Sequence, residues 1–348
     1  MLSMRGIVWV VAALGACGIA ALACGRDAAA GTFTDVVFTD YSSLSSNAEL
    51  ARRLFSPLAA VQLARALTES RKTLSEQSID LSEEKFGVYV PALRPPRGYA
   101  LLVFVPPWSD AKLPRGWSSV LDQYGVIFVS ATRSGNDASV LGRREPLALL
   151  AEQNIVRRYA VDPERVYIAG FSGGSRVAMR LALGYPDVFR GAILNAGSDP
   201  IGGADIPLPP RDLMFRFQSS TRLVYVTGDR DFPHLREDTA SITSMRRWCV
   251  FDVEGQVTLL AGHAVADPGA LSRALEALQD PSRPDTDRLM ACRSAIEKDL
   301  ATAMQQLESL IANGEHDAAQ TRLGEIDRRF GGLAAPRSVE LARDLLPK

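Results

Sequence analysis

Three features that mark large classes of protein are scarce in this sequence: net charge, cysteine and histidine. The 39 Lys and Arg residues are balanced by 40 Asp and Glu residues, and the net charge of −1 gives no general attraction to nucleic acid or to an anionic membrane. The four cysteines and three histidines do not have the spacing of a metal motif, and no glycine-rich phosphate loop follows the first expected strand. We therefore expect no nucleic-acid partner, no metal and no cofactor.

The rest of the composition is that of an ordinary folded protein. The chain has 348 residues, of which 47% are hydrophobic and 23% are charged, so disorder is not the default expectation. This length suffices for one large domain with appendages or for two modest domains.

The N-terminus has the pattern of an export signal. Arg5 precedes an uncharged stretch over residues 6–23, and polar residues follow. The letters "ALAC" ending at Cys24 resemble a bacterial lipoprotein box, which predicts a signal over residues 1–24 and lipidation of Cys24. Cleavage after Ala30, a weaker box ending at Cys17, and an uncleaved anchor are the alternatives. Each of them places the remaining chain outside the cytoplasm, in the cell envelope or secreted, with membrane contact only through this end.

Two further cysteines lie in the body of the chain. If the signal is removed at Cys24, Cys249 and Cys292 are the only unmodified thiols left. An oxidising compartment would allow a disulfide between them to persist, and two unpaired buried thiols are the alternative.

Short apolar runs alternate with helical stretches in the middle of the chain, which predicts βαβ units and a mostly parallel sheet with helices on both faces. Before this α/β domain (85–281) we expect a helical extension over residues 25–84. After it, residues 282–348 have the pattern of a helical hairpin broken at Asn313-Gly314. The expected strands are residues 85–91, 99–105, 125–131, 165–170, 191–197, 222–228 and 256–262.

A serine lies at the junction between one of these strands and the next helix. Gly170-Phe171-Ser172-Gly173-Gly174 satisfies G-x-S-x-G, the pattern of a sharp strand-to-helix turn that exposes a nucleophilic serine. Gly170 and Gly174 fit the close packing of strand and helix there, and the Gly173 N–H is free to face a substrate oxygen. A plain tight turn is the alternative. We therefore expect Ser172 to be a nucleophile.

A serine hydroxyl needs a base, and only three histidines are available. His263 follows Gly262 at the end of the last expected strand, which is the position of a triad histidine. His234 opens an expected helix and is the reserve candidate. His316 lies in the helical tail. The order of elements therefore favours His263.

The acid of a triad comes between the serine and the histidine in this chain order. Asp229 and Asp231 both follow the strand that ends at Gly228. Asp231 is preferred, because it lies one turn position further over the carboxyl edge of the sheet.

With these residues in place, the chain resembles the α/β-hydrolase superfamily, and within it the secreted feruloyl-esterase and polyhydroxyalkanoate-depolymerase-like esterases. The similar segments are "YALLVFVPPW", "YAVDPERVYIAGFSGGSRVAMRLALGYPDVFRGAILNAG", "TGDRD" and "AGH", within about residues 85–280. The resemblance implies an α/β-hydrolase fold and hydrolysis of carboxylic esters.

The chain departs from these relatives at the first oxyanion loop. Where they commonly have His-Gly, this sequence has Pro106-Pro107, followed by Trp108. Proline has no N–H, so the donor that joins Gly173 in binding an oxyanion must come from Trp108 or Ser109. The relatives place this donor at the position of Trp108, which we therefore prefer.

These features predict an exported serine esterase acting on a small or polymer-derived ester. A peptidase resembling prolyl-oligopeptidase catalytic domains, and an inactive envelope binding lipoprotein whose helical tail docks a partner, are the alternatives. The irregular segment over residues 198–213 is a candidate lid that would shape the substrate pocket.

Overall fold

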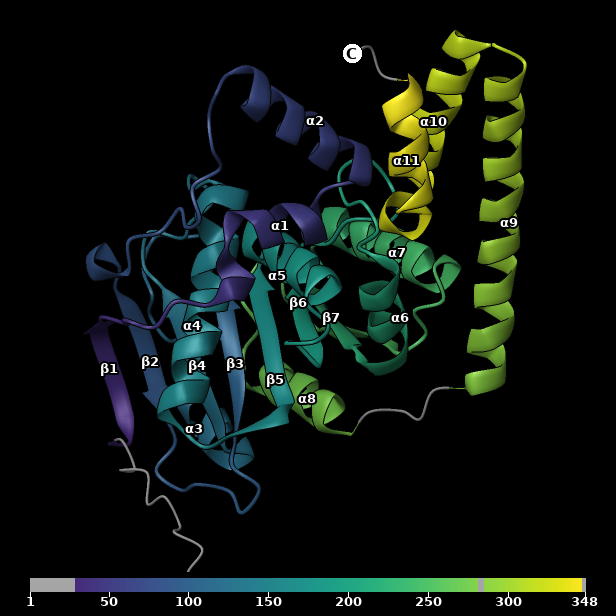
Figure 1. Cartoon of the computed structure of the whole chain (residues 1–348). Coiled ribbons are helices and arrows are strands. Elements are labelled where there is room, and N and C mark those ends of the chain that lie inside the picture. Colours follow the sequence, from purple (N-terminus) through teal and green to yellow (C-terminus); the bar gives the residue numbers. More distant parts are fainter. Residues whose placement is uncertain (1–28, 281–284, 346–348) are drawn as a thin grey trace, which may run out of the picture.

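The computed structural model describes residues 29–280 and 285–345, and its centre is an eight-stranded sheet (Figure 1). The strand order is β1-β2-β4-β3-β5-β6-β7-β8. The six neighbouring strands β4, β3, β5, β6, β7 and β8 run parallel. Strand β2 is antiparallel to β4, and β1 is antiparallel to β2. The strands are β1 (Gly31–Val36), β2 (Phe86–Val90), β3 (Tyr99–Val105), β4 (Val126–Ala131), β5 (Val161–Phe171), β6 (Gly191–Asn195), β7 (Arg222–Gly228) and β8 (Val253–Thr258).

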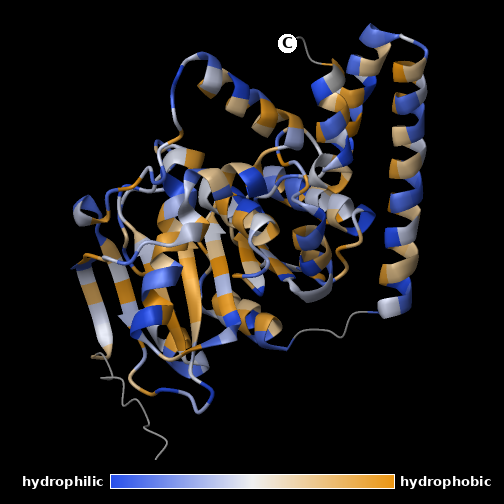
Figure 2. Ribbon diagram, viewed as in Figure 1, coloured by the Kyte–Doolittle hydropathy of each residue, from blue (hydrophilic) through white to orange (hydrophobic). Residues whose placement is uncertain are grey.

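The central strands are apolar because both of their faces are covered. Every residue of β3, β4 and β6 is buried, and helices α4 and α5 pack on one face of the sheet while α3 and α8 pack on the other. Figure 2 shows this core as orange strands between helices with blue outer faces. The predicted α/β class and mostly parallel sheet are thus confirmed. The α-helices are α1 (Asn47–Leu54), α2 (Pro57–Glu69), α3 (Trp117–Tyr124), α4 (Glu145–Arg158), α5 (Gly173–Gly184), α6 (Arg211–Ser220), α7 (Phe232–Arg247), α8 (Pro268–Gln279), α9 (Thr286–Ala312), α10 (His316–Phe330) and α11 (Arg337–Leu345).

The segment before the α/β domain differs from the expected helical extension. Helices α1 and α2 are present, but Gly31–Val36 form the edge strand β1, whose Thr32 lies opposite Tyr89 of β2. This strand is short, and only Phe33 and Val36 pack against the core. A half-exposed edge strand carries no continuous apolar run, so its pattern is weak in the sequence.

The predicted C-terminal helical hairpin is confirmed. Helices α9 and α10 pack against each other, and α11 follows and packs on α10 (Figure 1). The tail also contacts the chain's own N-terminal extension. The Asp327 carboxylate of α10 accepts hydrogen bonds from the Ser56 hydroxyl and, at 3.0 Å, from the Leu58 amide of α2. The helical face that was a candidate for an outside partner is therefore partly occupied by α2.

The candidate lid over residues 198–213 is packed into the molecule. Ile201, Ile206 and Leu208 within it are buried, and the Leu208 carbonyl accepts a hydrogen bond of 2.8 Å from the Gly332 amide. This segment therefore lies between the sheet domain and the tail.

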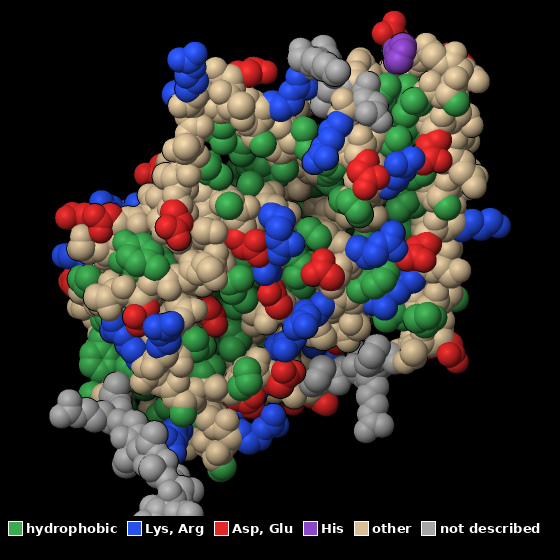
Figure 3. All heavy atoms as spheres, in the orientation of Figure 1, with side chains coloured by type: hydrophobic (Ala, Val, Ile, Leu, Met, Phe, Trp, Pro, Cys, Tyr) green, Lys and Arg blue, Asp and Glu red, His purple; other side chains and the backbone are tan. Residues whose placement is uncertain are grey.

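The surface in Figure 3 shows acidic and basic side chains interspersed over the face in view, as the balanced composition leads one to expect. Among the described helices, none combines the length and the apolar character needed to cross a membrane. The expected signal, with Cys17 and Cys24, lies outside the described residues.

A disulfide between Cys249 and Cys292 joins the end of α7 to α9. Of the two states left open by the sequence, the structure therefore has the bonded one. The bond connects residues 43 positions apart and ties the tail to the sheet domain. A cross-link of this span removes conformational entropy from the unfolded chain.

We predict that reduction of this disulfide lowers the free energy of unfolding by about 2–4 kcal/mol, the usual range for a disulfide. Urea unfolding with and without dithiothreitol measures the change. The double variant Cys249→Ser/Cys292→Ser is the control, because it should not respond to the reductant. An unchanged midpoint for the reduced protein would show that the bond does not stabilise the fold.

Candidate active site

The site begins at the turn between β5 and α5, where Ser172 has a strained backbone. Its φ is 54° and its ψ is −124°, a region that side-chain-bearing residues rarely occupy. Close packing holds the turn in this shape. A Cβ on Gly170 would lie 2.2 Å from the Gly174 carbonyl oxygen, and a Cβ on Gly174 would lie 1.9 Å from the Val105 carbonyl oxygen. Only glycine fits at either position, and the serine side chain is left half-buried at the carboxyl edge of the sheet.

A chain of hydrogen bonds joins the three residues that the sequence singled out. The Ser172 Oγ lies 3.0 Å from Nε2 of His263, and Nδ1 of His263 lies 2.7 Å from Oδ2 of Asp231. The other aspartate of the loop, Asp229, instead accepts a hydrogen bond of 3.2 Å from the Ala261 amide. The structure thus brings Asp231, rather than Asp229, to the histidine.

Asp231 is almost fully buried, with 5% of its side chain exposed. Burial alone would raise the pKa of this carboxyl group, but hydrogen bonds from His234 and His263 outweigh burial, and its pKa is lowered. The carboxylate therefore stays ionised at neutral pH and can accept a hydrogen bond from His263.

The oxyanion loop is held by a buried arginine. The Arg144 guanidinium, 3% exposed, donates hydrogen bonds of 2.9 Å to the carbonyl oxygens of Pro106 and Ser134. The Trp108 ring packs between Phe104 and Phe171, with ring centroids 6.3 and 6.1 Å away. The prolines and these contacts together restrict the backbone of the loop.

The two candidate oxyanion donors are the amides of Trp108 and Gly173. Neither amide donates a hydrogen bond to another described residue. The side chain of Asn136 lies against Gly173, because a Cβ added to Gly173 would be 2.3 Å from the Asn136 Oδ1. The backbone N–H of Asn136 donates a hydrogen bond of 3.0 Å to the Pro107 carbonyl oxygen. Asn136 thus connects the two halves of the candidate oxyanion hole, and it was not found from the sequence.

Asn195 at the end of β6 is a second residue that the sequence did not single out. Its carbonyl accepts a hydrogen bond of 2.8 Å from the Ser172 amide, its Oδ1 accepts one of 2.7 Å from the Ala266 amide, and its Nδ2 donates 2.8 Å to the Val226 carbonyl. It therefore ties the serine turn to β7 and to the segment after His263. Its place at the carboxyl end of a predicted strand is the only sign of this role in the sequence.

Three large apolar side chains next to these residues are exposed to solvent. Phe232 follows Asp231 and is 63% exposed, while Leu259 and Leu260 precede His263 and are 78% and 75% exposed. Leu260 has a φ of 59°, which is unfavourable for leucine. Folding alone does not favour these side chains at such positions.

The ligand atoms of Asp231, His234 and His263 lie within 4.8 Å of one another, a spacing that can hold a metal. The two imidazole rings are stacked, with planes 15° apart, and each Nδ1 faces the same carboxylate. Both Nδ1 atoms are therefore engaged by the carboxylate, and Nε2 of His263 faces the Ser172 Oγ, so these nitrogens do not share a position for a metal. The residues present do not fit a metal centre.

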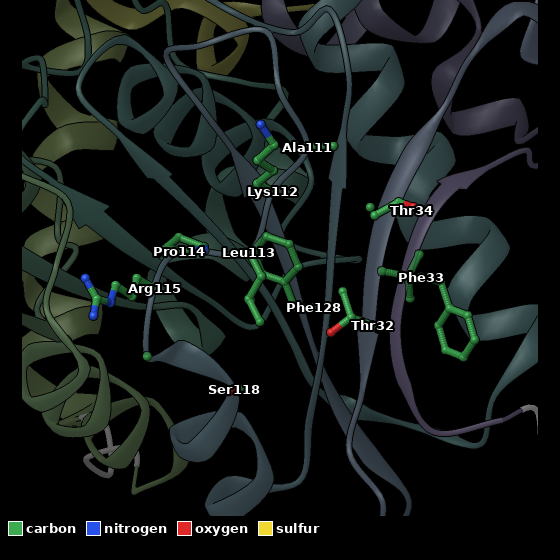
Figure 4. A pocket seen from close by; sticks show the side chains of 13 residues that line it. Thr32, Phe33, Thr34, Ala111, Lys112, Leu113, Pro114, Arg115, Ser118 and Phe128 are labelled. Carbon is green, nitrogen blue, oxygen red and sulfur yellow. The ribbon is translucent and has the colours of Figure 1, made fainter.

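A separate cavity of about 380 Å³ is lined in part by the loop that follows the oxyanion segment (Figure 4). It is lined by residues of β1 and β2, by residues 111–116, by Ser118 and by Phe128 of β4. Ser172, Asp231 and His263 are not among its lining residues. This cavity is therefore distinct from the candidate active site.

Residues 129–235 match the family of esterase PHB depolymerases, and this segment contains Ser172 and Asp231. A poly(3-hydroxybutyrate) depolymerase of Ralstonia pickettii is 34% identical over 98 residues, which cover 24% of this chain. The matched region spans only 20% of that relative's length.

Solved structures of similar proteins include an S-formylglutathione hydrolase from Staphylococcus aureus, with a TM-score of 0.43, 13% identity, and coverage of 57% of this chain and 93% of that one. An acetyl xylan esterase from Aspergillus awamori has a TM-score of 0.43 and 14% identity, and the match covers 57% of this chain and 95% of that one. Est1E from Butyrivibrio proteoclasticus has a TM-score of 0.42 and 15% identity, and the match covers 58% of this chain and 98% of that one.

The family match and the strand order of the sheet agree with the expectation from the sequence. The chain has the α/β-hydrolase fold, and its resemblance to esterases of the PHB-depolymerase type is confirmed.

Proposed function

We propose that this protein is an exported serine hydrolase that cleaves carboxylic esters through Ser172, His263 and Asp231. The observation that carries the proposal is the unbroken hydrogen-bond chain from the serine Oγ through His263 to the buried carboxylate. The match to esterase PHB depolymerases supports ester hydrolysis as the reaction class.

In the proposed reaction, the Ser172 Oγ attacks the ester carbonyl carbon while Nε2 of His263 takes the hydroxyl proton. The electron pair of the C=O bond moves to the oxygen, and the amides of Gly173 and Trp108 donate to this oxyanion. Collapse of the tetrahedral intermediate breaks the bond to the alcohol, which leaves with the proton from His263. Water, deprotonated by His263, then attacks the acyl-serine, and the acid and free serine are released.

Asp231 acts on His263 throughout this cycle. Its ionised carboxylate accepts the Nδ1–H, which keeps Nε2 free to act as a base toward the serine. The same carboxylate stabilises the imidazolium that forms when the proton is taken up.

The surroundings of the site favour an ester with apolar parts. The exposed side chains of Phe232, Leu259 and Leu260 flank the acid and the base in the chain, and they gain by burial against an apolar substrate. The substrate is accordingly a small or polymer-derived ester. Export is supported by the N-terminal signal pattern and by the Cys249–Cys292 disulfide, a bond typical of oxidising compartments.

The first prediction from the proposed function concerns the nucleophile. The purified protein should hydrolyse p-nitrophenyl butyrate and be labelled by a fluorophosphonate, whereas Ser172→Ala should do neither. Ser175→Ala is the matched control, because this serine lies one position beyond the elbow, is fully buried, and should still permit labelling at Ser172. Equal labelling of wild type and Ser172→Ala would refute the assignment, and turnover of peptides but not of esters would favour a peptidase.

The second prediction concerns the acid. Asp231→Asn should lower kcat by roughly 10⁴-fold, because a neutral amide favours the wrong histidine tautomer and cannot stabilise the imidazolium. Asp229→Asn, two residues away, should retain nearly full activity because its carboxylate only orders the Ala261 loop. Steady-state kinetics of both variants decide between them, and the opposite ranking would show that the acid is Asp229.

The third prediction concerns the N-terminus. Expressed in a bacterium that processes lipoproteins, the protein should incorporate labelled palmitate, and Cys24→Ala should not. Incorporation that persists in Cys24→Ala but is lost in Cys17→Ala would move the lipid to Cys17. No incorporation into the wild-type protein would contradict the lipid anchor.

A further inference from the structure

A second histidine shares the carboxylate of Asp231. Nδ1 of His234 lies 2.7 Å from Oδ1, while Nδ1 of His263 lies 2.7 Å from Oδ2, so each oxygen of the carboxylate has its own imidazole partner. The two rings also stack on each other, with centroids 4.2 Å apart and planes 15° apart. The Phe171 ring lies on His263 as well, at 4.8 Å. The general base thus has an aromatic neighbour that is bonded to its own acid.

The chain places His234 there by helical geometry. It is the third residue of α7, and Asp231 is the residue that precedes this helix. A spacing of three residues puts two side chains on the same side of a helical first turn. His263 arrives from the segment after β8, so two separate elements meet at one carboxylate.

The charged groups around His234 come from three elements. On α7 itself, Asp231 bonds to Nδ1, and the Glu237 carboxylate lies 3.9 Å from Nε2. Arg176 of α5 forms an ion pair of 2.7 Å with Glu237, and this pair offsets part of the negative charge of Glu237 near the imidazole. His263 faces the ring from the segment after β8, and the buried Asp238 is engaged by Ser198 and Thr227. With its proton on Nδ1, the His234 ring donates a hydrogen bond to Oδ1 of Asp231.

We infer that His234 is a positioning residue for the proposed reaction: it fixes the Asp231 carboxylate with a second hydrogen bond and holds the His263 ring by stacking. The inference rests on the proposed function and deepens it. His234 does not touch Ser172, and it acts only through the acid and the base.

Two physical effects follow from this arrangement. A carboxylate with a donor on each oxygen cannot rotate freely, so the direction of its bond to His263 is set before substrate arrives. The bond from His234 also uses part of the acceptor strength of the carboxylate, which leaves less of it for the bond to His263. The first effect keeps the His263 ring oriented toward Ser172, and the second weakens the hold of Asp231 on the His263 proton.

Two substitutions separate the hydrogen bond from the stacking. His234→Phe keeps an aromatic ring over His263 and removes the donor, whereas His234→Asn places an amide N–H near the position of Nδ1 and removes the ring. His316→Phe is the control, because this exposed histidine lies on α10 in the tail. For each variant, kcat, KM and the pH profile of p-nitrophenyl butyrate hydrolysis are measured, together with the thermal midpoint.

We expect His234→Phe to lower kcat by roughly 10- to 100-fold, the scale of a misplaced catalytic group, with KM nearly unchanged. The acid limb of its kcat/KM profile should move to higher pH, because the carboxylate then holds the His263 proton more strongly. His234→Asn should recover the wild-type acid limb and most of kcat. A folded His234→Phe with wild-type kcat and pH profile would overturn the inference, as would a loss of thermal stability alone.

A readout independent of turnover distinguishes this inference from the proposed function. In ¹⁵N NMR of the untagged protein, whose three histidines are assigned with the variants above, His234 and His263 should both carry their proton on Nδ1 at neutral pH. In Asp231→Asn, the signals of both rings should change, while that of His316 should not. A proton on Nε2 of His234 would overturn the inference even in an active esterase. The outcome of this NMR test does not depend on whether the protein hydrolyses esters.

Discussion

The strained turn at Ser172 is the constraint on which the rest of the site depends. The backbone holds this conformation because α5 approaches β5 at Gly170 and the end of β3 at Gly174 so closely that neither glycine can carry a side chain. Strain at a single residue costs of order 1–3 kcal/mol and persists only where the surroundings determine it. Here the surroundings are the neighbouring strands, since the Ser172 amide is bonded to Asn195 at the end of β6. The serine is therefore held by the close packing of the central strands and by this bond to β6.

The remaining groups are brought to this serine by the carboxyl ends of other strands. The segment after β3 supplies Trp108 and is held by Arg144, the segment after β7 supplies Asp231, and the segment after β8 supplies His263. In a parallel sheet these ends share one edge, so residues far apart in the chain meet there. The sheet sets the positions of these loops, and side-chain hydrogen bonds such as those of Asn195 set their orientation.

The sequence predicts those features that depend on local patterns. Seven strands were expected from their continuous apolar runs, and the serine turn from its glycines. The edge strand β1 was missed because its two large apolar residues, Phe33 and Val36, are three positions apart and give neither a run nor an alternating pattern. His234 was visible as a histidine three residues after Asp231, but it was considered only as an alternative base. Its partnership with the second carboxylate oxygen depends on how α7 meets the segment after β8, which no local pattern records. Arg144 and Asn136 were missed for the same reason, because their partners lie in other loops.

The central claim is that an acyl group is transferred to Ser172 in a preformed oxyanion hole, and a crystal structure with an alkyl boronic acid tests it most directly. We expect a tetrahedral boron bonded to the Ser172 Oγ. One boronate oxygen should accept hydrogen bonds from the amides of Gly173 and Trp108, and another should face Nε2 of His263. A boronate bound elsewhere at saturating concentration, or one on Ser172 whose oxygens point away from both amides, would contradict this account.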